Sequence, residues 1–170
     1  MEMMTAFFKE HSIASKIMIV LFVLTLMLLG MVDLFTFRMN PSGHLSGNGN
    51  PALLFIFIFV PLYLIMLGII AILSGTLFRD QFRQGSYHAG MFLFLMAMIA
   101  IGIFLERLYA SLIFGSLRGW PNSPYSMIQG WGVLNQYTNT AFFNIITYIL
   151  GWVGSIMLGY LWAAITHHRR

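Results

Sequence analysis

Four charged residues beside long apolar runs are the side chains of this sequence best placed to do chemistry. Glu106 and Arg107 are adjacent within residues 102–115, GIFLERLYASLIFG, while Asp33 and Arg38 follow the apolar residues 17–32. Ionisable side chains within a membrane segment are candidates for functional sites by default. Acids and bases at such a depth could pair across helices, bind a polar headgroup or carry a proton.

The spacing of these charges leaves three uses open. Neighbours on a helix point about 100° apart, so Glu106 and Arg107 are poorly placed to pair with each other. Counting from Tyr87 places Leu105 about 27 Å along a helix, so the pair that follows it lies close to one boundary of the hydrocarbon layer, where Asp33 and Arg38 also fall. The charges could reach water there, or join the first and third helices through crossed pairs, Asp33–Arg107 and Arg38–Glu106. A substrate, lipid-headgroup or proton site is the third use.

Other motifs of known chemistry are missing from the sequence. His88 stands near the start of a helix without a second histidine at matching depth, so no haem or metal site is predicted. His44 falls in a loop, and His167 and His168 lie in the C-terminal tail. There is no Cys, no Gly-rich phosphate loop and no His-Glu-x-x-His or Gly-x-Ser-x-Gly motif. We therefore predict no catalytic, cofactor-binding or metal-ligating residue, and an enzyme is not the favoured interpretation.

The composition indicates a single membrane domain over residues 1–170. The chain is 59% hydrophobic and 8% charged, with a mean hydropathy of +0.81, whereas a soluble domain carries about a quarter charged residues. The nine basic residues are scattered near the ends of the apolar blocks and form no phosphate-binding patch. Nucleic acid is therefore not a predicted partner.

The apolar blocks predict an all-α membrane protein with four transmembrane helices in an antiparallel bundle. Each block reaches the roughly 20 residues that cross a bilayer, and a spanning segment must satisfy its own backbone hydrogen bonds. We place the helices at about 16–37, 52–78, 87–117 and 141–166. The short connection between the second and third predicts that these two are neighbours. A further short helix lying on the membrane surface is possible within residues 1–10.

The basic residues also predict the topology. Six of them, Lys9, Lys16, Arg79, Arg83, Arg169 and Arg170, fall on one side of the predicted membrane and three on the other. Because basic residues concentrate in cytoplasmic loops, both termini are expected in the cytoplasm. The expected location is the cytoplasmic (inner) membrane of a prokaryote.

Two further features suggest contact surfaces. Small residues recur every four positions in the fourth helix and form a candidate packing face, for use within the bundle or against a partner chain: Gly151, Ser155, Gly159 and Ala163. The second outer loop carries aromatic residues suited to the membrane–water interface, which we interpret as a candidate outer-loop interface: Trp120, Tyr125, Trp131 and Tyr137.

These features favour a non-catalytic accessory or structural subunit that binds other membrane proteins or a second copy of itself, besides the lipid bilayer. One alternative is a component of an oligomeric transporter or channel, although the middles of the apolar blocks hold few polar residues. Another is an outer-leaflet enzyme that handles a lipid or a quinone with Asp33, Glu106 or Arg107. The sequence predicts no cofactor for any of these functions.

Overall fold

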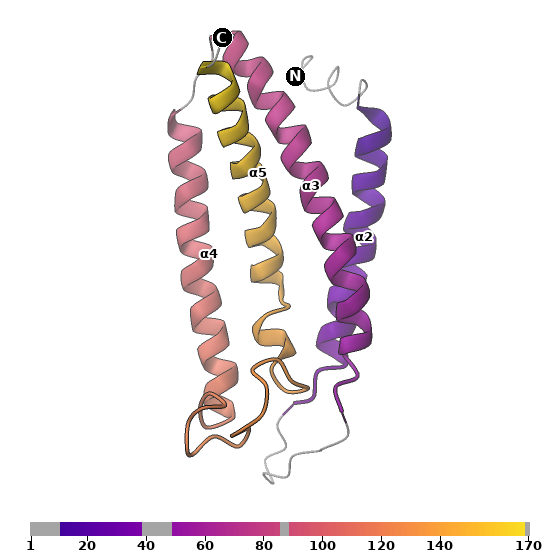
Figure 1. The fold of residues 1–170 in the computed structure, drawn as a ribbon, viewed down its shortest axis with the longest axis vertical. Helices are drawn as coiled ribbons and strands as arrows, with labels where there is room; N and C mark the ends of the chain where they lie inside the picture. The colour runs from indigo at the N-terminus through magenta and orange to yellow at the C-terminus, as the bar shows by residue number, and fades with distance from the viewer. Residues whose placement is uncertain (1–10, 39–48, 86–88, 169–170) are drawn as a thin grey trace.

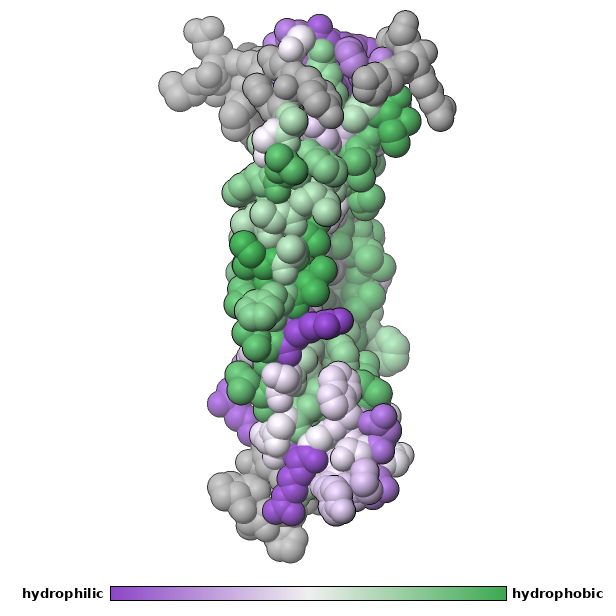
Figure 2. Space-filling model, turned by 90° about the vertical axis from the view of Figure 1, so that its left-hand side faces the viewer, coloured by the Kyte–Doolittle hydropathy of each residue, from purple (hydrophilic) through white to green (hydrophobic). Residues whose placement is uncertain are grey.

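The computed structural model describes residues 11–38, 49–85 and 89–168, and every regular element in those ranges is helical. The long helices are α2 (Ser12–Leu34), α3 (Leu53–Arg83), α4 (Ala89–Ser116) and α5 (Ile145–His168), and a short 3-10 helix, η1 (Asn139–Ala141), precedes α5. All four long helices are long and apolar enough to cross a membrane. On the face drawn in Figure 2, a broad apolar band lies between two more polar ends. The possible surface helix in residues 1–10 lies outside the described residues.

The boundaries of α2 and α3 differ from the predicted ones. α2 begins four residues earlier than predicted and stops at Leu34 rather than residue 37, because Phe37 donates its N–H to the carbonyl of Gln136 at 2.7 Å. α3 continues to Arg83 instead of residue 78. Its polar last turn is compatible with a helix, and Arg83 lies 4.0 Å from Asp80.

The other two predicted helices also shift. α4 ends at Ser116, one residue before the predicted end, and its expected start at 87 lies outside the described residues. The fourth helix was expected from 141 to 166, but α5 runs from Ile145 to His168. η1 ends at Ala141, the predicted first residue of that helix, and three non-helical residues separate it from α5.

The helices lie side by side in the spatial order α4, α5, α3, α2 (Figure 1). α3 packs against α2 and α5, and α4 packs against α5. The short connection between α3 and α4 predicted that these two would be direct neighbours, and this prediction is wrong because α5 lies between them. Since α4 has one main packing partner, much of its apolar surface faces outward.

The segments after α2 and after α4 meet at one end of the molecule, which we call the loop end. In addition to the Phe37–Gln136 hydrogen bond, the side-chain amides of Asn50 and Asn139 donate to each other at 2.9 and 2.8 Å. At the opposite end, the rings of Phe82 and His167 are 6.2 Å apart, and α2 begins at this end (Figure 1).

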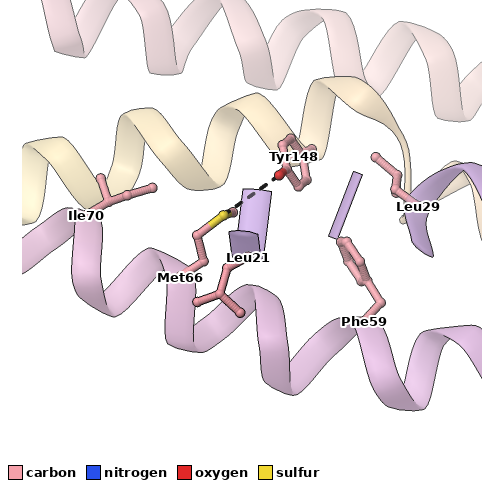
Figure 3. Packing of buried hydrophobic residues seen from close by; sticks show 6 residues of the cluster. All are labelled: Leu21, Leu29, Phe59, Met66, Ile70 and Tyr148. Carbon is pink, nitrogen blue, oxygen red and sulfur yellow. Dashed lines mark hydrogen bonds between the residues drawn. The ribbon is translucent and has the colours of Figure 1, made fainter. Parts of the chain in front are cut away.

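Polar atoms within the long helices are used for contacts between helices. The hydroxyls of Thr25 and Tyr148 are 2.8 Å apart, and Thr25 also donates to the carbonyl of Leu21. Tyr63 donates to the carbonyl of Tyr148 at 2.5 Å, and the sulfur of Met66 lies 3.9 Å from the Tyr148 hydroxyl (Figure 3). Thr25 is fully buried, so these groups join α2, α3 and α5 rather than line an open path.

The small-residue face of α5 packs inside the molecule, against α3. A Cβ atom added to Gly159 would lie 2.6 Å from the carbonyl oxygen of Ala71 and 2.7 Å from the nitrogen of Gly75. A Cβ atom at Gly151 would collide with the Tyr63 ring. Ser155 and Ala163 are buried. Close approach of two backbones explains the small residues, so this face is occupied within the chain.

This packing predicts that Gly159→Ala destabilises the protein by about 1–3 kcal/mol, because the added methyl group meets backbone atoms that cannot rotate away. Gly154→Ala is the matched control, since a Cβ atom there meets nothing within 4 Å. We expect the control to be neutral or slightly stabilising, as alanine is the better helix former. Unfolding free energies in detergent measure both, and equal values for the two variants would contradict the packing.

Candidate functional site

Asn144 fixes the start of α5. Its side-chain oxygen accepts hydrogen bonds from the N–H groups of Ile146 at 2.8 Å and Thr147 at 3.1 Å. In return, the Thr147 hydroxyl accepts the N–H of Asn144 at 3.1 Å. This reciprocal arrangement is a capping box, which satisfies backbone donors that a helix start otherwise leaves unpaired. It explains why α5 starts at Ile145 and not at Ala141.

The amide nitrogen of the same side chain joins α5 to α4 and η1. Asn144 Nδ2 donates to both carboxylate oxygens of Glu106, at 3.1 and 3.0 Å, and to the carbonyl of Thr140 at 3.0 Å. The carboxylate thus lies at the N-terminus of α5, where the helix dipole also favours negative charge. Glu106 has a partner that the sequence-based pairing did not include.

The other predicted charges lie apart from this contact. Asp33 Oδ2 is 4.0 Å from a guanidinium nitrogen of Arg38, and these side chains are 58% and 87% exposed, respectively. Arg107 is exposed. The expected crossed pairs, Asp33–Arg107 and Arg38–Glu106, are not among the ion pairs of the described residues. The physical reason is that α2 and α4 are not packed together at this level.

A groove separates α2 from α4 at the loop end. It consists of two adjoining cavities, of about 370 and 340 Å³, which share Asp33, Tyr109 and Thr140 in their linings. We call the two together the α2–α4 groove. Residues at the start of α5 form part of its wall, including Asn144. Asp33 therefore lines the α2–α4 groove, and Glu106 is bound to Asn144, which also lines it.

The groove changes from apolar to polar along its length. Away from the shared residues, the first cavity is lined mainly by apolar side chains, among them Leu26, Leu29, Phe143 and Ile146. The second cavity adds polar groups, among them Thr36, Arg38, Ser116 and Tyr137. Within the described part of the chain, the Tyr109 hydroxyl has no hydrogen-bond partner, although it lines both cavities. This grading suits a molecule with an apolar tail and a polar head.

The loop between α4 and α5 closes the same end, and its four predicted interface aromatics divide into two pairs. Trp120 stacks on Phe114 with the ring centroids 3.8 Å apart, yet remains 47% exposed, and Tyr125 is 84% exposed. Tyr137 is buried, with Trp131 beside it at 6.1 Å. Only Trp120 and Tyr125 are therefore available as a surface.

Sequence reasoning missed Asn144, Tyr109 and Thr140. The spacing Asn-x-x-Thr at residues 144–147 matches a helix-start signal, but the continuous apolar pattern from Ala141 favoured an earlier start. Tyr109 lies one turn from Glu106 and thus on the same side of α4. Nothing in the sequence shows that Thr140 would line the same cavity as Tyr109 and accept a hydrogen bond from Asn144.

Comparison of this chain with protein-family models, with curated proteins and with solved structures finds no match in any of the three.

The Asn144–Glu106 contact predicts a specific pattern of loss and rescue. Asn144→Asp keeps the acceptor that caps α5 but turns a carboxylate toward Glu106, so we expect a loss of about 1–3 kcal/mol of stability. Adding Glu106→Gln restores a donor to the pair and should recover most of that loss.

Unfolding free energies of the two single variants and the double variant measure this coupling. Asn144→Ala serves as the control, because it removes the cap as well as the contact and should not be rescued by Glu106→Gln. Simple additivity of Asn144→Asp and Glu106→Gln would show that the two side chains do not interact.

Proposed function

We propose that this chain is a non-catalytic multi-pass membrane protein that binds an amphipathic membrane molecule in the α2–α4 groove. The observation that carries the proposal is the pair of cavities joined at Asp33, Tyr109 and Thr140, apolar on one side and polar on the other. Ligand sites are mostly apolar hollows with a few placed polar groups.

The extent of the groove favours a lipid-like molecule over a transmembrane helix of another protein. On α2 the lining covers Leu26 to Arg38, only the part of the helix nearest the loop end and the residues after it. A helix crossing the membrane is about 10–12 Å wide and needs a contact along roughly 30 Å. A headgroup with the upper part of an acyl chain needs much less.

The proposal includes an orientation in the membrane. With the four helices forming an antiparallel bundle and both termini in the cytoplasm, the loop end faces outward and the groove opens at the outer leaflet. The distribution of basic residues supports this, as argued from the sequence. The membrane would be the cytoplasmic membrane of a prokaryote.

Filling the groove tests the proposal. Gly30 lines the first cavity, and a Cβ atom there meets nothing within 4 Å, so we expect the side chain of Gly30→Leu to extend into the ligand's space. We expect retained lipid, measured by native mass spectrometry after mild extraction, to fall roughly tenfold, equivalent to about 1.4 kcal/mol.

Gly68→Leu is the matched control for this experiment. Gly68 is an exposed helical glycine with nothing within 4 Å of an added Cβ atom, and it lies in α3 away from the groove lining. It should retain lipid as the unmodified protein does. Equal retention in Gly30→Leu and Gly68→Leu would refute binding in the groove.

A second candidate function is that of an accessory subunit for another membrane protein. The exposed aromatic side chains of Trp120 and Tyr125 at the loop end favour it, because Trp and Tyr are enriched in protein interfaces. The small-residue face of α5 gives no support, since α3 already covers it. A partner would therefore bind through the loop end.

Single cysteines test both the orientation and this second function, because the chain has no native Cys. Tyr125→Cys should react with a membrane-impermeant maleimide in intact cells and, with a bifunctional reagent, crosslink to one fixed membrane-protein partner. Gln84→Cys, exposed at the opposite end, should react only after permeabilisation. The reverse labelling pattern would overturn the orientation, and a Tyr125→Cys chain that stays monomeric would count against the accessory role.

A further inference from the structure

We propose that the α2–α4 groove selects a zwitterionic phospholipid with a primary ammonium headgroup, of the phosphatidylethanolamine type. The assignment rests on the proposed function, because it specifies the polar end of the molecule bound there. Asp33 would accept hydrogen bonds from the ammonium group, and Arg38 would bind the phosphate. Both side chains line the second cavity, at the polar end of the groove.

Asp33 and Arg38 present one acid and one base that are held loosely. They are 4.0 Å apart and largely exposed, and such surface ion pairs contribute little to stability. Each side chain can therefore give up its ion-pair partner and bind the oppositely charged group of a lipid headgroup at a small cost in free energy. A zwitterion supplies both opposite charges in one molecule, so the exchange leaves neither side chain unpaired.

The cavities that Asp33 lines place it where the apolar and polar parts of the groove meet. The acyl chains and the headgroup of a bound lipid would join at this point. Asp33 lines both cavities of the groove and a third hollow of about 640 Å³ on the flank of α2, and Arg38 lines two of these three. Leu26 and Leu29, along the apolar cavity, lie about 10 and 6 Å from Asp33 along the helix. An acyl chain fits there, with its headgroup at Asp33.

Other groups at the same place argue against other classes of lipid. The Tyr109 hydroxyl, which has no hydrogen-bond partner among the described residues, can donate to a phosphate oxygen. Glu106 does not line either cavity, but its carboxylate is bound to Asn144, which lines the first cavity. An anionic lipid would pair with Arg38 but would place its negative charge beside the carboxylate of Asp33. An uncharged lipid or a quinone would pair with neither Asp33 nor Arg38.

The experiment measures lipid binding to the delipidated full chain in detergent by native mass spectrometry. Phosphatidylethanolamine, phosphatidylglycerol and diacylglycerol with identical acyl chains are compared. We expect phosphatidylethanolamine to bind roughly tenfold more tightly than phosphatidylglycerol, the effect of a charge-assisted hydrogen bond, and diacylglycerol to bind most weakly. Asp33→Asn should abolish the preference between the two phospholipids, and Arg38→Gln should weaken both.

Asp80→Asn and Arg83→Gln are the matched controls, because these residues form an ion pair of the same 4.0 Å length in the last turn of α3. They should leave the preference unchanged. Equal binding of both phospholipids, with binding lost in Gly30→Leu, would overturn the headgroup assignment and leave the groove standing. Binding unaffected by Gly30→Leu would overturn the groove itself. A preference that survives in Asp33→Asn would also refute the assignment.

Discussion

The hydrogen bonds of Asn144 connect the start of α5, the loop before it and Glu106 of α4 at one end of the molecule. Its oxygen caps α5, and its nitrogen donates to the carboxylate of Glu106 in α4 and to the carbonyl of Thr140 in η1. In an environment with little water, an unpaired carboxylate or helix end would be costly. The side chain of Asn144 pairs with both the carboxylate and the helix end. It therefore fixes the position of α4 beside α5 and the path of the loop at the same point.

The middle of the molecule obeys a different constraint, the close approach of α3 and α5. Where Gly159 meets Ala71 and Gly75, the backbones leave no room for a Cβ atom. Further along, the Thr25–Tyr148 contact brings in α2. Both kinds of contact bury the polar and small residues that might otherwise form a path or a docking face. The α2–α4 groove lies outside these contacts, at the loop end.

Hydropathy predicted the helices because each needs about 20 apolar residues, whatever surrounds it. The spatial order of the helices could not be predicted, since in lipid every apolar face is equally well solvated and packing is decided by small residues and hydrogen bonds. The same limit applies to the site. Glu106 and Asp33 stood out by charge alone, but their partners depend on which helices meet. Asn144 was overlooked because an apolar run conceals a cap within it.

The late start of α5 and the presence of the groove have the same cause. Had the helix begun at Ala141, ordinary α-helix would replace the segment that now runs from the end of η1 to Asn144. Instead, the capping box stops the helix at Asn144, and the narrower η1 precedes it. Thr140, Phe143 and Asn144 then form a wall of the hollow between α2 and α4. The contact that holds this end of the molecule together also leaves the space in which we propose that a ligand binds.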